Sequence, residues 1–340
     1  MVATRAIGVT SLTDAGSGPG CGRFAPSPTG DLHLGNARTA LLAWARARSL
    51  GQRFVMRVED LDGPRTVASA VDGNLDELRW LGLEWDEGPD VGGRHAPYRQ
   101  SARGERYLAA LEALRERGEV FECFLSRRDL REAASAPHGP AGPVYGPGER
   151  ARNASLAAQR RADGRLAALR FAPPAGELHA LDALHGRIAF DAERDVGALV
   201  VRRADGLWAY ALAVVVDDAS MGVSEVVRGD DLLAASGAQL ALMRALGLTP
   251  PTYLHVPLLL DANGERLAKR RGDRTLRSLR DAGVDPSRLR GALLASAGLV
   301  ERPRSLTPAE AVAAFDLSRL TRAPARWDEA LEAFMLGDRA

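Results

Sequence analysis

The stretch "RFAPSPTGDLHLGNARTALLAW", residues 23–44, decides our prediction of the fold, because a stiff loop in it leads directly into a helix. "CGRF" (21–24) indicates a short strand, and two prolines and two glycines follow within residues 26–35. From about Asn36 to Leu50 apolar residues recur at helical spacing, so we expect a helix there. A strand, a tight loop and a helix in this order place backbone N–H groups and the positive end of the helix dipole at one point.

The corner between loop and helix, "HLGN" (33–36), carries groups that suit a nucleotide. His33 and Asn36 can donate hydrogen bonds to phosphate oxygens, and Gly35 leaves room for a flat ring to approach the backbone. In an open parallel sheet, ligands bind at such loops. A proline-rich connection with a surface histidine would have the same sequence, so the motif alone leaves both interpretations open.

The segments that follow predict an α/β protein with a parallel sheet. "RFVMRVEDLD" (53–62) alternates like a strand, and a helix is expected over 67–81. Strand, helix, strand and helix in this order are typical of a parallel sheet. Further on we expect a half-buried strand over "WAYALAV" (208–214) and a buried strand within 251–260.

Composition excludes several classes of protein. The 340 residues include 45 Lys and Arg and 44 Asp and Glu, which gives a formal net charge of +1. This balance excludes a protein that holds nucleic acid by bulk charge, but it is compatible with a local basic patch. The only two cysteines, Cys21 and Cys123, indicate a reducing compartment, so we expect a cytoplasmic protein. No apolar run is long enough to span a bilayer.

A second motif, "RLAKR" (266–270), follows an apolar segment far downstream. By itself such a basic run is typical of a solvated surface. Together with "HLGN" it resembles the two ATP-binding signatures of class I aminoacyl-tRNA synthetases. "GRFAPSPTGDLHLGNARTAL", "RFVMRVEDLD", "RRADGLWAYALAVVVDDASMGVSEVVRGDDLL" and "RLAKR" also stand in the order expected of the glutamyl-tRNA synthetase group. The chain is therefore identified as a member of that group over residues 22–273.

The resemblance implies a class I synthetase fold, with a Rossmann-like parallel sheet, an inserted small α+β domain and a short C-terminal helical region. We expect a disordered extension over 1–20, the two halves of the catalytic domain at 21–115 and 195–274, and the insertion at 116–194. Helices at 275–340 are expected to contact the tRNA stem, with no anticodon-binding domain.

The charges of glutamate agree with the residues that the resemblance selects. Glutamate has two carboxylates and one ammonium group, so Arg23 and Arg228 can each offer a fork of hydrogen bonds, and Glu59 can pair with the ammonium. Taken alone, Glu59 and Arg228 would be typical of surface ion pairs and Tyr210 of a core strand. The resemblance implies glutamate contacts at Arg23, Ala25, Ser27, Glu59, Tyr210 and Arg228, and ATP contacts at His33, Gly35, Asn36, Arg266 and Lys269.

The resemblance also implies the reaction. The glutamate carboxylate attacks the α-phosphate of ATP without a nucleophilic side chain, with Mg²⁺ on the phosphates and with His33 and Lys269 as the catalytic residues. The stretch "LAVVVDDASMGVSEVVRGDDLL" (212–233) most resembles truncated members of the group. Those enzymes activate glutamate without tRNA and attach it to the queuosine base in the anticodon of tRNA(Asp).

Two alternatives stay open: a truncated enzyme that charges the 3′ end of a tRNA, and a paralogue that binds tRNA or glutamate with weakened catalysis. Two departures motivate the latter: Ala268, where the second signature usually has serine, and the loss of zinc ligands in the inserted domain. We expect a monomer in either case.

Many relatives bind zinc in the inserted domain through two thiolates of a C-x-C pair, a tyrosine and a third thiolate. The corresponding residues here are Cys123, Leu125, Tyr145 and Glu149. Leucine cannot coordinate a metal, and a structural zinc site needs four ligands, so the pattern argues against zinc.

Two aspartate pairs, Asp217–Asp218 and Asp230–Asp231, could suggest another metal site. We expect them instead to orient the ribose, cap helices or support Arg228, and we predict no metal ligand in the chain.

Overall fold

A computed structural model of the chain describes residues 20–126, 129–130, 144–261, 263–265, 267 and 274–337. The extension expected over 1–20 therefore lies outside the described residues, except for its last position. The strands and helices in chain order are β1 (Cys21–Phe24), α1 (Leu34–Ser49), β2 (Arg53–Met56), α2 (Ala68–Trp80), α3 (Gly104–Glu116), β3 (Val120–Cys123), α5 (Pro147–Ala162), β4 (Ala168–Phe171), β5 (Glu177–Asp182), β6 (Gly186–Asp191), β7 (Leu199–Arg202), α6 (Tyr210–Ser220), β8 (Glu225–Gly229), α7 (Ala235–Leu246), β9 (Thr252–Val256), β10 (Leu259–Leu260), α8 (Leu276–Asp281), α9 (Pro286–Ser296), α10 (Pro308–Ala313), β11 (Ala325–Arg326) and α11 (Glu329–Leu336).

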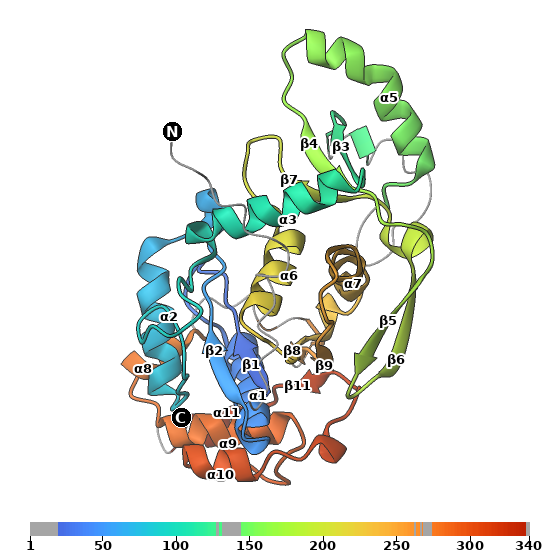
Figure 1. The fold of residues 1–340 in the computed structure, drawn as a ribbon. Helices are drawn as coiled ribbons and strands as arrows, with labels where there is room; N and C mark the ends of the chain where they lie inside the picture. The colour runs from blue at the N-terminus through green and yellow to red at the C-terminus, as the bar shows by residue number, and fades with distance from the viewer. Residues whose placement is uncertain are drawn as a thin grey trace.

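The expected parallel pairing is present at the centre of the molecule (Figure 1). β1 pairs in parallel with β2, and β8 pairs in parallel with β9. β5 joins β9 in parallel and β6 antiparallel, which gives the order β6-β5-β9-β8. The backbone N–H of Ser224, just before β8, donates to the carbonyl of Cys21 at 2.9 Å and brings the start of β1 beside the start of β8. The carboxyl ends of these two strands therefore open on the same side.

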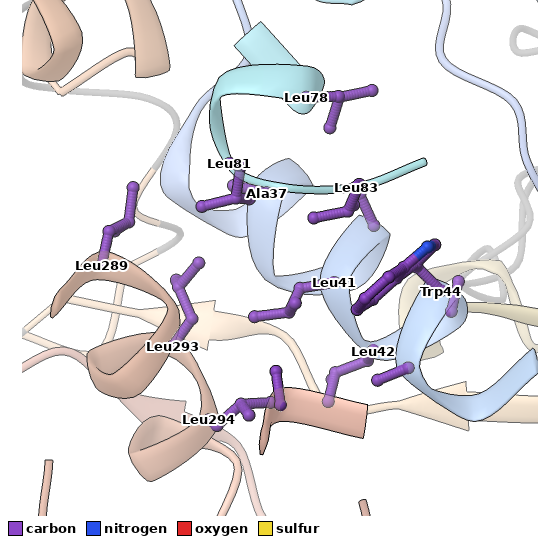
Figure 2. Packing of buried hydrophobic residues seen from close by; sticks show 14 of the residues in the cluster. Ala37, Leu41, Leu42, Trp44, Leu78, Leu81, Leu83, Leu289, Leu293 and Leu294 are labelled. Atoms are coloured by element: carbon purple, nitrogen blue, oxygen red, sulfur yellow. The ribbon is translucent and has the colours of Figure 1, made fainter. Parts of the chain in front are cut away.

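Helix α1 is held by packing on several sides. Ten of its residues are buried, and nine of these are alanine, leucine or tryptophan; the tenth is Arg38, whose Nη1 donates to the carbonyl of Pro257 at 2.6 Å. Leu41 of α1 shares one core cluster with Leu78 of α2 and Leu293 of α9, and Figure 2 shows these side chains converging between the helices. Each fully buried leucine contributes about 1.5–3 kcal/mol to stability. The C-terminal helices thus fix the helix whose first turn forms the "HLGN" corner.

One predicted strand is wrong, because the segment 208–214 enters helix α6 at Tyr210 instead. Leu212–Val216 are fully or almost fully buried in a second core cluster with residues of α3 and α7. A helix that is apolar on every side shows no helical periodicity, so a short apolar run does not distinguish it from a buried strand.

A small antiparallel sheet and helix α5 project from the rest of the molecule (Figure 1, at the top, with α5 and β4 in green). In this sheet β4 pairs with β3 on one side and with β7 on the other. This strand pairing crosses the boundary that we expected between the insertion (116–194) and the second catalytic half (195–274). β7, which follows residue 194, joins the small sheet, whereas β5 and β6, which precede it, join β9. The five-part division of the chain stays a prediction.

The region after residue 274 contains α8–α11 and the short strand β11, which pairs in parallel with β10. Threonine side chains cap two of these helices: Thr275 accepts a hydrogen bond from the N–H of Ser278, and Thr307 from that of Glu310. Within the described residues, no helix combines the length and the apolar character that crossing a membrane requires.

Candidate active site

A cavity of about 660 Å³ opens at the carboxyl ends of β1 and β8, the edge at which parallel sheets bind ligands. Nine of the predicted site residues line it: Arg23, Ala25, Ser27, His33, Gly35, Asn36, Glu59, Tyr210 and Arg228. The other two, Arg266 and Lys269, lie outside the described residues, as does Ala268. Leu267, between them in sequence, is described and lines the cavity. The fold thus brings together side chains from four distant segments, and their roles stay a prediction.

The "HLGN" corner forms one end of this cavity. His33 is the N-cap residue of α1 and has an extended backbone, while Gly35 and Asn36 lie in the first turn. That turn contains no acidic residue, so the positive end of the helix dipole is not neutralised locally. A Cβ atom added to Gly35 would meet nothing within 4 Å, which agrees with open space for a ligand above the backbone.

The segment after the second signature is attached to this corner. Thr275 forms an isolated antiparallel bridge with His33, and the N–H of Leu276 donates to the carbonyl of Leu32 at 2.7 Å. Both Thr275 and Leu32 line the cavity. The chain that leaves residues 268–273 therefore starts next to the predicted ATP corner.

Arg23 is buried, with 5% of its surface exposed, and keeps donors available. Its Nη1 donates to the carbonyl of Val227 at 3.2 Å. Its Nε has no hydrogen-bond partner among the described residues, although the Asp218 carboxylate lies 3.6 Å away. A buried guanidinium with unused N–H groups at a cavity wall is suited to bind an anion that the protein does not supply.

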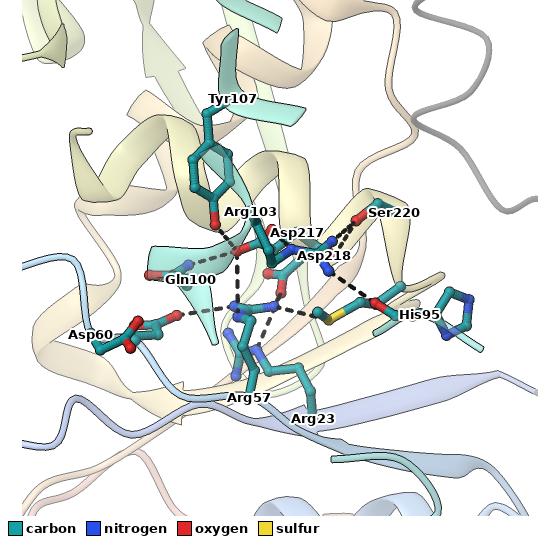
Figure 3. Close-up of polar contacts among 12 residues, drawn as sticks. Arg23, Arg57, Asp60, His95, Gln100, Arg103, Tyr107, Asp217, Asp218 and Ser220 are labelled. Atoms are coloured by element: carbon teal, nitrogen blue, oxygen red, sulfur yellow. Dashed lines mark hydrogen bonds and ion pairs between the residues drawn. The ribbon is translucent and has the colours of Figure 1, made fainter. Parts of the chain in front are cut away.

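Arg57 lies behind the cavity at the centre of a buried ionic network (Figure 3). It is fully buried, with Nη1 2.7 Å from Asp218 and Nη2 3.0 Å from Glu59. Burial raises the pKa of Glu59, and the charge and hydrogen bond of Arg57 only partly offset this effect. For Asp218 burial also acts upward, but Arg57 and Arg23 outweigh it and hold the pKa below its usual value. Among the described residues Glu59 thus has one ion-pair partner, Arg57, and its side chain is only 8% exposed. A cationic group in the cavity would stabilise its ionised form.

Asp217 continues the network on the far side of Asp218. It accepts hydrogen bonds from Arg103 at 2.5 Å, Tyr107 at 2.8 Å and Gln100 at 2.8 Å. The pair Asp217–Asp218 therefore compensates buried arginines, which agrees with a supporting role, but the hydrogen bonds go to Arg57 and Arg103 rather than to Arg228.

Arg228 is held far more tightly than Arg23, with 4% of its surface exposed. Its partners are Nε2 of His255 (3.0 Å), Oε1 of Gln239 (2.9 Å), the carbonyl of Leu232 (3.3 Å) and Oγ of Ser236 (2.8 Å). The guanidinium also lies over the ring of Tyr253, 5.0 Å from its centroid. Among the described residues one Nη1 N–H is left for a ligand, so the structure offers a single hydrogen bond where we expected a fork.

Tyr210 is less enclosed than the strand interpretation implied. It begins α6 and keeps 41% of its surface exposed while it lines the cavity. Its ring therefore forms part of the cavity wall near the opening rather than part of the core.

The four positions that correspond to a zinc site lie together around a small apolar cluster. Cys123, Leu125 and Tyr145 pack in it, with Sγ of Cys123 3.7 Å from the hydroxyl of Tyr145. Glu149 instead uses its carboxylate to accept the N–H of Gly146 at the start of α5. Among the described residues no group of three or more His, Cys, Asp or Glu side chains could hold a metal. The donor set present here does not fit a structural zinc ion.

Sequence reasoning missed three of the buried polar residues that support this site: Arg57, Asp182 and His255. Arg57 carried no signal of its burial, because in the alternating segment 53–62 it shares a face with Arg53 and Glu59, which is typical of a side that faces solvent. Asp182 and His255 are 73 residues apart and carried no local pattern that connects them.

The comparisons with known proteins agree with this geometry. The model of the family "tRNA synthetases class I (E and Q), catalytic domain" matches residues 21–329. The chain is 49% identical over 308 residues to the glutamyl-Q tRNA(Asp) synthetase of Symbiobacterium thermophilum, a match that covers 90% of this chain and 95% of that protein. It is also 49% identical over 305 residues to the glutamyl-Q tRNA(Asp) synthetase of Nocardia farcinica, with 90% and 92% covered.

A solved structure is similar in space as well. The crystal structure of a glutamate tRNA ligase from Elizabethkingia meningosepticum, in complex with its amino acid, matches with a TM-score of 0.80 at 26% identity. That match covers 93% of this chain and 69% of the other.

Proposed function

The chain belongs to the class I tRNA synthetases of the glutamyl (E) and glutaminyl (Q) type, and from this premise we propose that it is a ligase that activates L-glutamate with ATP, without tRNA. We further propose that it transfers the glutamyl group to the queuosine base in the anticodon of tRNA(Asp). The two relatives that support this choice are glutamyl-Q tRNA(Asp) synthetases, and the match spans nearly the whole of each.

One observation carries the first half of the proposal: a single cavity contains two buried arginines, a glutamate whose side chain is 8% exposed and the open N-terminus of α1. The unused N–H groups of Arg23 suit a carboxylate, and Glu59 suits an ammonium group. The helix terminus suits the phosphates of ATP. An amino acid with a second carboxylate, bound next to a triphosphate, uses all of these features.

The proposed chemistry needs no nucleophilic side chain. The glutamate α-carboxylate forms a bond to the α-phosphorus of ATP, and pyrophosphate leaves with its electron pair and with the Mg²⁺ that accompanies the phosphates. The cavity contributes by positioning the two reactants and by stabilising the charge that develops on phosphorus. We assign this stabilisation to His33 and Lys269, and ATP contacts to Gly35, Asn36 and Arg266.

In the proposed second step, an oxygen of queuosine attacks the carbonyl carbon of glutamyl-adenylate and AMP leaves. The proposal has three finer parts: the partner is tRNA(Asp) that bears queuosine, the enzyme works as a monomer, and it acts in the cytoplasm, where it meets that tRNA. Glutamate contacts at Ala25, Ser27 and Tyr210 complete the proposed site.

Transfer of labelled glutamate tests the proposal, with three forms of tRNA(Asp): intact, lacking the 3′-terminal adenosine, and lacking queuosine. We expect labelling of the first two and none of the third. Labelling that requires the terminal adenosine but not queuosine would show that the enzyme charges the 3′ end and would overturn the proposed acceptor. Activation of glutamate with no labelling of any form would overturn transfer to tRNA(Asp).

A further inference from the structure

A chain of three buried residues from neighbouring strands ends at the cavity. Asp182 is the last residue of β5, His255 lies in β9 and Arg228 in β8. Oδ2 of Asp182 is 2.7 Å from Nδ1 of His255, and Nε2 of His255 is 3.0 Å from Nε of Arg228. All three are buried, and His255 is completely so. Only Arg228 of the three lines the cavity.

The hydrogen bonds fix the proton on His255. A guanidinium can only donate, so Nε2 of His255 must accept from Arg228 and carries no proton. The proton of a neutral ring then resides on Nδ1 and is donated to Asp182. Burial lowers the pKa of His255, which agrees with a neutral ring.

Asp182 is itself held in one orientation. Its Oδ1 accepts the backbone N–H groups of Leu184 at 2.9 Å and His185 at 2.7 Å, and its Oδ2 also accepts the N–H of His255 at 3.0 Å. Burial acts to raise the pKa of Asp182, but these hydrogen bonds outweigh it and hold the pKa below its usual value. The carboxylate is therefore ionised, and it can only accept from Nδ1 of His255. It therefore selects the one tautomer of His255 that can accept from Arg228.

We propose that Asp182 and His255 are positioning residues for amino-acid binding: they hold the Arg228 guanidinium so that its single available N–H points at a carboxylate of the substrate. This inference rests on the proposed function, because it takes glutamate as the ligand of Arg228. Gln239, Ser236 and Leu232 hold three of the four other N–H groups of Arg228, and the contact with His255 fixes the position of its Nε.

A histidine in the other tautomer would turn an N–H toward Nε of Arg228. The two donors would repel each other, and the guanidinium would leave its plane over Tyr253. The contact of Arg228 with its carboxylate is sensitive to this change, because Arg228 offers no second N–H that compensates for a misdirected one.

Two variants of His255 separate this role from simple filling of the core. In H255Q the side-chain oxygen can take the place of Nε2 and accept from Arg228; in H255N the shorter amide can still reach Asp182 but not Arg228. Glutamate-dependent exchange of pyrophosphate into ATP gives KM for glutamate and KM for ATP separately. For H255N we expect KM for glutamate to rise about ten- to hundredfold, as for loss of one charged hydrogen bond, with KM for ATP changed by less than about threefold. For H255Q we expect a rise at least about fivefold smaller.

H179Q serves as the matched control, because His179 lies on β5 with Asp182 but does not line the cavity, and it should leave both KM values unchanged. Equal effects of H255N and H255Q on KM for glutamate, or equal effects of H255N on both KM values, would overturn the positioning role. If the wild-type chain shows no glutamate-dependent exchange, the proposed function fails, and the role assigned to Arg228 fails with it.

A measurement on the wild-type chain covers the case in which the variants do not fold. Nitrogen chemical shifts of the assigned His255 ring report its tautomer directly. The proposal requires a proton on Nδ1 and none on Nε2 at neutral pH. A proton on Nε2 would overturn it.

Discussion

Replacing Arg23 by lysine should weaken glutamate binding while it leaves ATP binding intact. Lysine keeps the positive charge near Asp218, which lies 3.6 Å from Nε of Arg23, so the buried acid is not left without a cation. It removes the planar fork, however, and a lysine ammonium cannot reproduce two parallel hydrogen bonds to a carboxylate. The change therefore tests the donors of Arg23 rather than its charge.

The structure sets the size of the effect. Among the described residues, only one N–H of the Arg23 guanidinium has a hydrogen-bond partner, the carbonyl of Val227. The free N–H groups of Arg23 suffice for two parallel hydrogen bonds to a carboxylate of glutamate. A lysine at this position would make only one of these two charged hydrogen bonds. Such a bond contributes about 1.5–3 kcal/mol, which corresponds to a roughly 10- to 150-fold increase in KM for glutamate.

Glutamate-dependent pyrophosphate exchange, measured at saturating ATP, gives this value. R48K is the matched control: Arg48 donates to the carboxylate of Asp86 at 2.7 Å and to the carbonyls of Glu84 at 3.0 Å and Gln52 at 3.5 Å, but does not line the cavity. A KM for glutamate that is unchanged in R23K, or that rises equally in R48K, would refute the assignment of Arg23 to the substrate.

Three further predictions follow from the buried charges and the insertion. Burial raises the pKa of Glu59, and only its ionised form attracts an ammonium group, so KM for glutamate should rise as the pH falls through a pKa above the usual carboxyl value. The variant E59Q should bind glutamate weakly at every pH. A pH profile of KM that is the same in E59Q as in the wild type would contradict the assignment. R57M should lower the free energy of unfolding by about 3–5 kcal/mol in urea titrations, since it leaves the buried Asp218 without its closest cation. R65M, which removes an exposed ion pair with Asp62, should change the free energy of unfolding by less than about 1 kcal/mol. Equal losses of stability in the two variants would argue against the buried network. Prolonged treatment with a zinc chelator, followed by dialysis into magnesium buffer, should change neither the melting temperature nor the rate of pyrophosphate exchange. Leu125 cannot bind zinc, and the Glu149 carboxylate already accepts a backbone N–H. A melting temperature that falls on chelation and is restored by zinc would contradict this prediction.

Local chemistry made the loop and the start of α1 predictable from the sequence, while their role in binding ATP stays a prediction. Prolines, glycines and a following helical pattern within residues 23–44 are enough to predict a loop before a helix terminus, and α1 begins two residues before the predicted start. The grouping of Arg23, Glu59, Tyr210 and Arg228 in one cavity was different. Nothing in their local sequence connects them, and the expectation came from the resemblance to a known family.

What the sequence could not reveal depends on contacts between distant segments. The helix at Tyr210 looked like a strand because burial on all sides removes the helical period. The tight hold on Arg228 could not be predicted either, since His255 reaches it from another strand and is itself oriented by Asp182. Side chains that act through one another become visible only when the strand order is known.

The proposed activation of glutamate is tested most directly by pyrophosphate exchange with the wild-type chain in the absence of any tRNA. We expect exchange of labelled pyrophosphate into ATP with L-glutamate, and at least about tenfold less with glutamine or aspartate at equal concentration, because one carboxylate is missing in the first and misplaced in the second. Exchange that appears only after tRNA is added, or that does not distinguish glutamate from glutamine, would contradict the account.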